Sequence, residues 1–308
     1  MSTPALLDIL CLGEPLFEFA EMPDGHWQGG IGGDVSNVAI AARRQGAKTG
    51  MLTRLGNDSF GDAIMAAWAD EGVRAEAVAR VPTAPTGLYF IRQTPQGHAF
   101  EYRRAGSAAS LMTPADLPRD ALAACRLLHV SGISQAISDS AAAAVHEAMT
   151  IARMAGGAVS YDTNLRLKLW PLEKAREVIH GAMTRADIAL PGLEDARHLT
   201  GLEAPEDIAR FYMDLGPHTV ALTLGAQGAL VATKAAMTHI PPRPADAVDA
   251  SGAGDCFDGA FLAEWLRRGD PVSAGHYAVT AASLSVEGIG AVAPIPNAQE
   301  VRAAMNAG

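Results

Sequence analysis

The feature that most constrains the fold of this chain is the regular alternation of short apolar runs with longer segments of helical spacing. Most of the apolar runs are followed by a stretch whose hydrophobic residues recur with a helical period. These runs are "LLDILCLG", "KTGMLTRLG", "RLLHVSG", "AVSYDTN", "ADIALPG" and "TVALTLG". Parallel strands are joined by crossover helices, which cover both faces of their sheet. The alternation therefore predicts an α/β fold, in which a mainly parallel sheet lies between two layers of helices.

The hydrophobic spacing and the stop signals also indicate where the main helices lie. We expect helices over residues 35–45, 59–71, 138–154, 172–184, 205–215 and 254–268. Gly46 and Gly72 follow the first two of these segments and are typical of helix ends. The chain has 308 residues and shows neither a repeat nor a linker, so we expect one large domain that spans residues 1–308.

Two stretches interrupt the alternation. They are "LFEFAEMPDGHWQGGIGG" near the start and "TGLYFIRQTPQGHAFEYRRAGSA", where two alternating runs flank a turn-rich "QTPQG". Both are typical of antiparallel strands. Because they are alike in type but distant in sequence, we expect residues of about 13–34 and 84–108 to form one small sheet. Such a sheet would project from the main body and cover an active site as a lid.

Charge and cysteine usage exclude several classes of partner and location. The net charge is −10 and lysine occurs without any basic cluster, which argues against a nucleic acid partner. No apolar run approaches the ~20 residues needed to cross a bilayer, and the first residues lack the pattern of a signal peptide. The three cysteines are odd in number and widely spaced, as in proteins of the reducing cytoplasm. We therefore expect a cytoplasmic protein without membrane contact.

The segment "DASGAGDCFDGAFLAEW" places small residues and an acid at the start of an apolar helix. The amide groups of Gly252, Ala253 and Gly254 are suited to bind an anion there, because N–H groups at a helix start lack intrahelical partners. Taken alone, the segment is equally consistent with an Asp255 that merely caps the helix.

Two other nucleotide-binding motifs are incomplete or missing. Phe257 replaces the third glycine of a dinucleotide-binding fingerprint, and the sequence contains no Gly-Lys pair. A Rossmann dehydrogenase is therefore disfavoured, and a P-loop site is excluded.

A second glycine-rich segment, "GGIGGDVSNVAIAARRQGAKTGMLTRLGNDSFGDAI", begins at Gly29. Its glycines precede a helix that carries Asn37 on the first turn. Backbone amides and one side-chain amide could there form hydrogen bonds with a polyol. By itself, the segment is also consistent with a tight turn followed by a capped helix.

In combination, the two segments resemble the signature regions of the PfkB, or ribokinase-like, carbohydrate kinases. These are a Gly-Gly-x-x-x-Asn segment early in the chain and a Gly-Ala-Gly-Asp segment late in it. The resemblance extends over essentially the whole chain, and "TVALTLGAQGAL" is similar to the family's nucleotide-binding strand and turn. It implies a ribokinase-like three-layer α/β/α fold with a projecting β-sheet lid. It also implies phosphoryl transfer from ATP, with Mg²⁺, to a sugar hydroxyl.

Within this family, six motifs are most similar to 2-keto-3-deoxygluconate kinases. They are "GEP" at Gly13, "GGDVSN" at Gly32, "TGLY" at Thr86, "EYRRAGSA" at Glu101, "HVSGIS" at His129 and "DTNLRLKLW" at Asp162. The similarity implies a sugar acid as substrate, phosphorylated on its terminal 6-hydroxyl. Arginines suit this substrate, because a guanidinium can hold a carboxylate by two parallel hydrogen bonds. A fructokinase, a ribokinase, a 5-dehydro-2-deoxygluconokinase and a regulator that binds ATP without turnover are the alternatives.

The resemblance implies a role for each matching residue. Asp255 would accept the proton of the attacking hydroxyl, while Gly252, Ala253 and Gly254 hold the γ-phosphate. The sugar acid would also contact Gly33, Asn37, Tyr89, Tyr102, Arg103 and Arg166, with the tyrosines and arginines around its carboxylate. The expected ATP site consists of Asn164, Arg166, Thr223, Gly225, Gly228, Gly252 and Gly254. The adenine is expected to pack near residues 281–285.

Further expectations concern ions and assembly. Glu194 would bind Mg²⁺ indirectly through water, although Pro191 stands where the wider family has an asparagine. Parts of the family bind a monovalent cation such as K⁺ near the late loops, and the sequence leaves open whether this chain does. Lids pair between subunits in relatives, so we expect a homodimer or a larger homo-oligomer.

Overall fold

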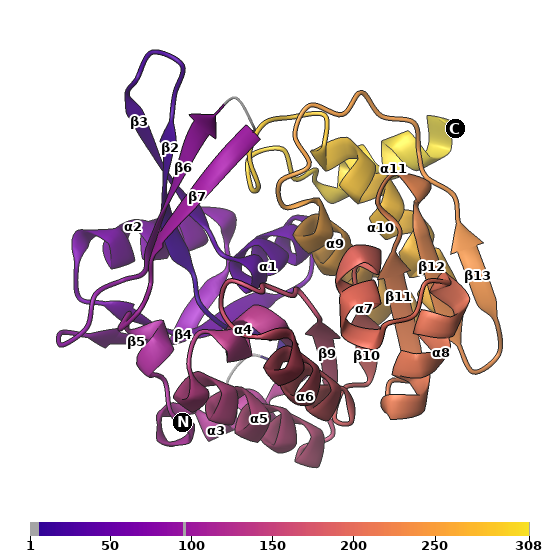
Figure 1. Ribbon diagram of the computed structural model, residues 1–308, viewed down its shortest axis with the longest axis horizontal. Coiled ribbons are helices and arrows are strands. Elements are labelled where there is room, and N and C mark those ends of the chain that lie inside the picture. The colour runs from indigo at the N-terminus through magenta and orange to yellow at the C-terminus, as the bar shows by residue number, and fades with distance from the viewer. Residues whose placement is uncertain (1–5, 95–96, 308) are drawn as a thin grey trace.

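The computed structural model of the protein describes residues 6–94 and 97–307. Within these residues a nine-stranded sheet forms the centre, in the order β13-β12-β11-β10-β9-β8-β1-β4-β5 (Figure 1). Its strands are β1 (Leu7–Leu12), β4 (Thr49–Gly56), β5 (Arg74–Val81), β8 (Cys125–Ser131), β9 (Ala158–Asp162), β10 (Ile188–Leu190), β11 (Thr219–Thr223), β12 (Ala229–Thr233) and β13 (Met237–Ile240). The seven strands from β11 to β5 pair in parallel, and β12 alone runs the opposite way, pairing antiparallel with both β11 and β13. The prediction of a mainly parallel sheet is confirmed.

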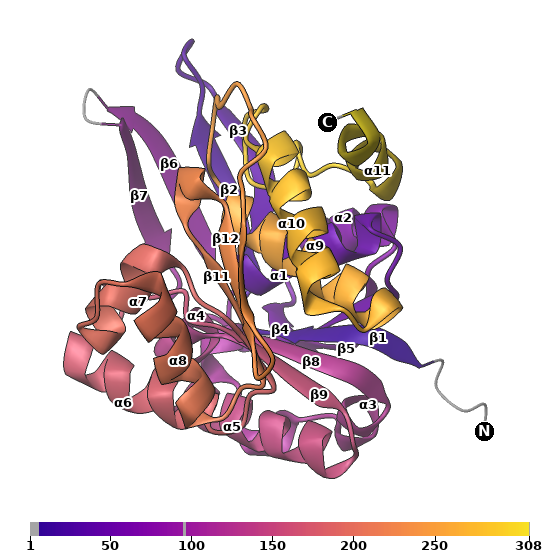
Figure 2. The same ribbon diagram turned by 90° about the vertical axis from the view of Figure 1, so that its right-hand side faces the viewer.

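Helices cover both faces of this sheet (Figure 2). One layer contains α1 (Asp34–Arg44), α2 (Ser59–Glu71), α9 (Ala253–Arg268), α10 (Pro271–Ser285) and α11 (Ala298–Ala307). The other contains α3 (Arg119–Ala123), α4 (Gly132–Ala136), α5 (Asp139–Met154), α6 (Leu172–Met183), α7 (Leu193–Thr200) and α8 (Pro205–Leu215). Short 3₁₀ turns cover Ala109–Leu111, Pro114–Asp116 and Gly225–Gln227. The six predicted helices are all present, with ends that differ from the expected ones by at most one residue.

Each face of the sheet has its own apolar core. Trp68 and Phe257 are buried in the first. Tyr161 and Tyr212 are buried in the second. The three cysteines are buried and free. In the part of the chain that the structure describes, no helix combines the length and the apolar character that a membrane span requires.

The two stretches that interrupt the alternation form a second sheet, which we call the lid. It contains β2 (Leu16–Glu21), β3 (Trp27–Gly32), β6 (Leu88–Thr94) and β7 (Gly97–Arg103), in the order β3-β2-β6-β7. Each stretch is an antiparallel hairpin as predicted, but the hairpins join through a parallel pairing of β2 with β6. The pairing is parallel because β2 follows β1 and β6 follows β5, and these two strands point the same way. Both hairpins therefore leave the body in one direction (Figure 1).

Parallel pairing also fixes where the functional segments meet. The carboxyl ends of β1, β8, β9, β10 and β11 lie along one edge of the sheet. Open α/β sheets bind their ligands outside this edge. The lid rises from the same edge, because β2 begins four residues after β1 ends.

Candidate active site

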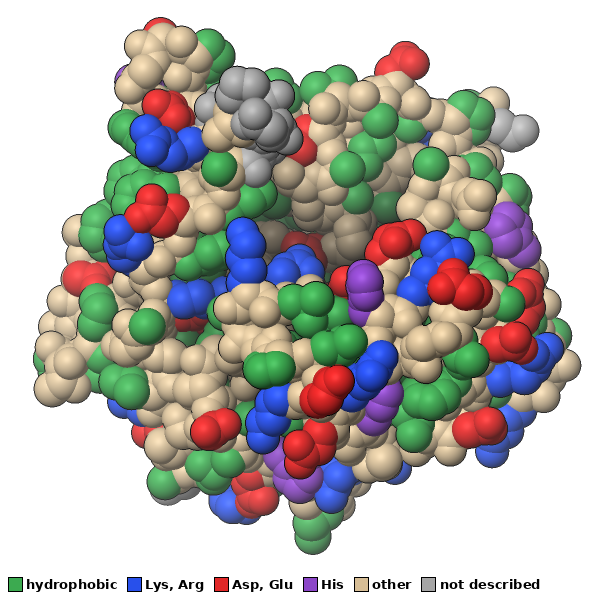
Figure 3. All heavy atoms as spheres, viewed as in Figure 1, with side chains coloured by type: hydrophobic (Ala, Val, Ile, Leu, Met, Phe, Trp, Pro, Cys, Tyr) green, Lys and Arg blue, Asp and Glu red, His purple; other side chains and the backbone are tan. Residues whose placement is uncertain are grey.

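A cavity of about 1260 Å³ lies between the lid and the carboxyl edge of the sheet. Figure 3 shows it as a hollow in the surface, with Lys and Arg side chains along its rim. Side chains from both parts of the molecule line it, among them Glu14, Glu18, Asp34, Tyr89, Tyr102, Arg104, Asn164, Arg166, Asp195 and Asp255. Acidic and basic groups thus face the same enclosed space, although the chain as a whole is acidic.

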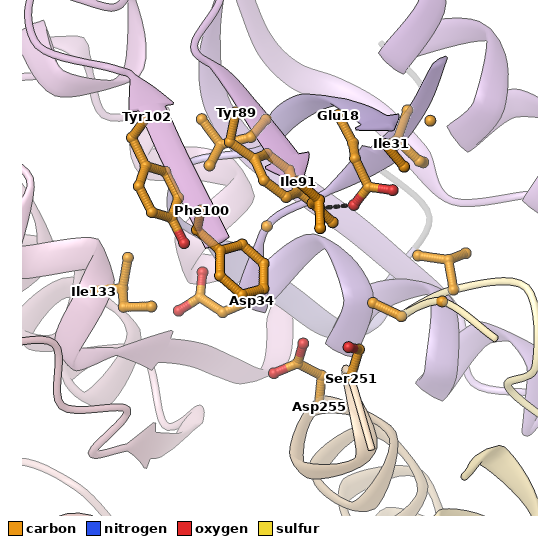
Figure 4. A pocket seen from close by; sticks show the side chains of 18 of the residues that line it. Glu18, Ile31, Asp34, Tyr89, Ile91, Phe100, Tyr102, Ile133, Ser251 and Asp255 are labelled. Carbon is orange, nitrogen blue, oxygen red and sulfur yellow. Dashed lines mark hydrogen bonds between the residues drawn. The ribbon is translucent and has the colours of Figure 1, made fainter. Parts of the chain in front are cut away.

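Asp255 stands at the floor of this cavity, on the first turn of α9 (Figure 4). The side chain of Asn37, on α1, donates a hydrogen bond of 2.7 Å from Nδ2 to Asp255 Oδ2. Burial raises the pKa of Asp255 to about 7, and the negative charge of Asp34 adds to the shift. The Asn37 hydrogen bond and the charge of Arg166 oppose it. The structure therefore unites the two glycine-rich segments around one carboxyl group of unusually high pKa.

A second carboxyl group lies beside Asp255. Asp34 Oδ2 accepts hydrogen bonds from the Ser131 hydroxyl and, at 3.5 Å, from Asn164 Nδ2. Asp34 Oδ1 is buried and has no hydrogen-bond partner among the described residues. Burial raises the pKa of Asp34, and Figure 4 shows its carboxyl group near that of Asp255. A buried acceptor of this kind favours a ligand that brings a donor or a positive charge.

The main chain at the start of α9 is shaped by two glycines with different surroundings. Gly252 has φ = 70°, and a Cβ there would lie 2.7 Å from the carbonyl oxygen of Ala291. No atom lies within 4 Å of a Cβ placed on Gly254, which is exposed. The Ala253 amide already donates to the Ala250 carbonyl at 3.2 Å. Of the three expected phosphate donors, Ala253 thus has a partner within the turn, while the Gly254 position opens into free space.

Among the residues expected at the sugar acid, Gly33, Tyr89, Tyr102 and Arg166 line the cavity, whereas Asn37, which binds Asp255, and Arg103 do not. Arg103 is 64% exposed and forms an ion pair with Glu101 on the other face of the lid. Successive side chains of a strand point to opposite faces, so Tyr102 and Arg103 of β7 cannot both face the cavity. The structure therefore separates Arg103 from the rest of the expected site.

Arg104 lies in the cavity, where its neighbour Arg103 was expected. Its guanidinium lines the cavity 5.4 Å from the ring centroid of Tyr102, and its Nε donates to Glu14 Oε2 at 2.7 Å. Glu14 is fully buried and accepts a second hydrogen bond, of 2.6 Å, from the Ser107 hydroxyl. The sequence analysis missed Arg104 and Glu14. The sequence does contain a signal for Arg104: side chains alternate between the two faces of a strand, so Arg104 is expected on the same face as Tyr102.

The loop after β9 brings Asn164 and Arg166 to the same cavity. Asn164 has φ = 28°, a conformation that asparagine tolerates better than most residues. The main-chain amide of Asn164 donates to Asp162 Oδ1 at 3.0 Å, and the main-chain amide of Leu165 donates to Asp195 Oδ2 at 2.8 Å. These hydrogen bonds fix the loop between β9 and the first turn of α7.

Glu194, the expected indirect Mg²⁺ ligand, is 82% exposed and pairs with Arg197 at 3.2 Å. It does not line the cavity, whereas the adjacent Asp195 does. Among the described residues, no cluster of three or more His, Cys, Asp or Glu side chains could hold a metal ion without other ligands. A metal in this cavity would therefore need ligands from water or a bound substrate.

Thr223, Gly225 and Gly228, which are expected at the nucleotide, lie at the end of β11 and in the turn that follows it, outside the lining of this cavity. Thr223 forms a bridge with Gly192, next to α7. Gly225 and Gly228 both have positive φ, at 60° and 89°, in the turn to β12. Residues 281–285 belong to the last turns of α10, where Ala281 and Ser285 are buried. The roles expected for these residues in ATP binding stay predictions.

The fold, the paired signature segments and the cavity define a carbohydrate kinase. The chain matches the pfkB family of carbohydrate kinases over residues 7–298, and it belongs to that family of phosphotransferases, which have an alcohol as acceptor.

Three relatives illustrate the range of similarity. A 2-dehydro-3-deoxygluconokinase from Thermoproteus tenax is 32% identical over 98% of this chain and 95% of its own. Fructokinase-2 from Solanum lycopersicum is 34% identical over 75% of this chain and 71% of its own. An E. coli protein crystallised in complex with ATP and Mg²⁺ superposes with a TM-score of 0.90 at 26% identity, covering 98% of this chain and 100% of that one.

Proposed function

We propose that the protein uses ATP to phosphorylate the terminal 6-hydroxyl of 2-keto-3-deoxygluconate. The observation that carries this proposal is the cavity in which the guanidinium groups of Arg104 and Arg166 share one space with Asp255. A sugar acid has a carboxylate at one end and a primary hydroxyl at the other. The arginines suit the first group, and the carboxyl group of Asp255 suits the second. Similarity to the Thermoproteus tenax enzyme over nearly the whole chain supports the same substrate.

In the proposed reaction, Asp255 accepts the proton of the attacking hydroxyl. Asn37 keeps the carboxylate oriented, because its amide occupies Oδ2 and leaves the other oxygen for the substrate. Phosphoryl transfer passes through a loose transition state, so positioning and charge stabilisation matter more than the strength of the base. The amides at Gly252 and Gly254 supply fixed donors for the transferred phosphate, next to the positive end of the α9 dipole.

We propose ATP and Mg²⁺ as the cofactors, as in the E. coli structure that holds both. Mg²⁺ is commonly held by phosphate oxygens, water and only one or two carboxylates, which fits a site whose described residues form no metal-binding cluster. Asp195 in the cavity, or Glu194 through water, would serve as the carboxylate, and Asp34 Oδ1 is buried with no hydrogen-bond partner among the residues that the structure describes. When bound, the ion would neutralise charge on the phosphates.

The outer face of the lid supports a proposal about assembly. Trp27, Phe90, Arg92, Glu101 and Arg103 surround a shallow hollow there, and Trp27 is 41% exposed. We propose that this face pairs with a second copy in a homodimer that acts in the cytoplasm. Light scattering during gel filtration tests the assembly, and a monomer at micromolar concentration would contradict it.

A neutral sugar is the second candidate substrate, because a carboxylate also lies at the lid end of the cavity. Glu18 accepts a hydrogen bond from the Tyr89 hydroxyl, and burial raises the pKa of Glu18 (Figure 4). Such a group could hold sugar hydroxyls, as the similarity to a fructokinase also suggests. Ribokinase and 5-dehydro-2-deoxygluconokinase activities belong to the same alternative.

A coupled assay of ADP release decides between these substrates. We expect 2-keto-3-deoxygluconate to give the highest kcat/KM in a panel with fructose, ribose, gluconate and 5-dehydro-2-deoxygluconate. A preference for fructose or ribose would refute the sugar-acid proposal but keep a sugar kinase. ATP binding without turnover on any member of the panel would refute both.

A further inference from the structure

The last turn of α1 ends in an arginine whose guanidinium is surrounded by acceptors. Arg44 Nη1 donates to the main-chain carbonyl oxygens of Val292 at 2.9 Å and Ile295 at 2.7 Å, and over a longer distance of 3.4 Å to that of Ala293. Its Nε and Nη2 donate to the two carboxylate oxygens of Glu71, at 3.0 and 2.6 Å. The Arg44 side chain is only 21% exposed. Both ends of the guanidinium are therefore fixed.

The three carbonyls belong to residues 286–297, the loop that joins α10 to α11 and that we call the bracing loop. Main-chain carbonyl oxygens converge on one point in this way where proteins bind a monovalent cation. Their negative ends repel one another unless a positive charge lies between them. In this chain the guanidinium of Arg44 supplies that charge, and Glu71 holds it in place.

The bracing loop lies directly against the segment that precedes Asp255. The amide of Gly290 donates to Asp249 Oδ2 at 2.9 Å. A Cβ on Gly252 would lie 2.7 Å from the carbonyl oxygen of Ala291, so the two main chains are in close contact. A movement of the bracing loop would therefore displace the first turn of α9.

Helix α1 holds the same turn from the other side. Asn37, on the first turn of α1, binds Asp255, and Arg44 ends the helix. The two helices α1 and α9 pack tightly, since a Cβ on Gly259 would lie 2.7 Å from the carbonyl oxygen of Val38. One rigid helix thus positions both the carboxyl group and the bracing loop.

We propose that Arg44 is a positioning residue that serves as a built-in cation. It holds the bracing loop, and through that loop it keeps residues 252–255 in the geometry that binds the transferred phosphate. Turnover by the natural protein consequently needs no added monovalent cation. This role rests on the proposed function, because it requires the turn at Gly252 to bind the phosphate of ATP.

The test compares Arg44→Met with the matched control Arg43→Met. Arg43 precedes Arg44 on the same helix, but its Nε donates to the Gly72 carbonyl at 3.0 Å, outside the bracing loop. We would measure kcat and KM at constant ionic strength in tetramethylammonium chloride, with K⁺ or guanidinium added in millimolar amounts. The natural protein and Arg43→Met should keep kcat within about twofold in every salt. Arg44→Met should lose about tenfold or more in kcat, with little change in KM for the sugar acid, and guanidinium should restore part of the loss.

Several results would overturn the proposal. They are an unchanged kcat in Arg44→Met, a loss that neither guanidinium nor K⁺ repairs, and a natural protein that requires K⁺. If Arg44→Met does not fold, Arg44→Lys takes its place in the test. Lysine keeps the positive charge but lacks the guanidinium group, so kcat should fall and added guanidinium should restore it. A loss of kcat that guanidinium does not restore would again count against the role. If no sugar is phosphorylated, the proposed function fails by itself. The rise in Tm caused by Mg²⁺–ATP then tests Arg44, since Arg44→Met should lose this rise and guanidinium should restore it.

Discussion

Replacement of Asp255 by asparagine should separate the catalytic role that we propose for this residue from its effect on stability. The substitution removes the ionisable group but keeps an oxygen that can accept the hydrogen bond from Asn37. A general base typically contributes about 10²–10⁴-fold to the rate, and kcat should fall by that amount. Binding of ATP and of the sugar acid should persist, because the shape of the site is unchanged.

The same substitution should change how stability depends on pH. Burial raises the pKa of Asp255 from its ordinary value of 3.8 to about 7 on folding, so between these pH values the folded protein binds a proton that the unfolded chain has lost. The stability from this proton is fully present below pH 3.8 and is lost as the pH rises through about 7. With 1.36 kcal/mol per pH unit, the two units from pH 5 to the folded pKa correspond to about 2–3 kcal/mol.

Urea unfolding at pH 5 and pH 8 measures this difference. The natural protein should lose about 2–3 kcal/mol more than Asp255→Asn between the two values, so the variant becomes relatively more stable at pH 8. Equal losses in the two proteins would show that Asp255 titrates in the folded state as it does in the unfolded chain. Near-normal turnover by the variant would refute its role as the base.

The remaining predictions concern the arginines, the glycines and the pH profile. Arg104→Met should raise KM for the sugar acid about tenfold or more, whereas Arg103→Met should leave steady-state kinetics within about twofold, and equal effects would contradict the assignment of Arg104 to the cavity. Gly252→Ala should lower the free energy of unfolding by about 1–3 kcal/mol, because φ is 70° there, as urea titration would show. Gly254→Ala should fold normally but bind ATP more weakly in calorimetry, and unaltered ATP binding would remove this position from the phosphate site. Finally, kcat/KM should fall about tenfold per pH unit below about 7, where Asp255 becomes protonated, and a flat profile from pH 5 to 8 would exclude it as the base.

The sequence predicted the central sheet well, because its alternation is a local signal that repeats along the chain. The same holds for Asn37 and Asp255, which are 218 residues apart but belong to two recognisable segments. Strands β5, β12 and β13 were not among the predicted runs. The sequence of β5, "RAEAVARV", has little β-branched character, and this strand pairs only at an edge of the sheet.

The details of the site depended on information that no single segment contains. The parallel pairing of β2 with β6 results from the directions of β1 and β5, which lie in a different sheet. The cluster around Asp34 joins a helix, the end of β8 and the loop after β9. The contacts of Arg44 likewise could be predicted only if the position of a loop about 250 residues further along the chain were known. Motif spacing could not reveal these neighbours.

One strand of the lid has a consequence for how such an enzyme can change over time. In β7, Phe100 and Tyr102 face the cavity, and Glu101 and Arg103 face outward. Neighbouring codons in the gene thus act on two surfaces that do not touch. With the roles that we propose for the two faces, mutation would adjust the choice of sugar at one codon and subunit association at the next, so the two traits could diversify independently.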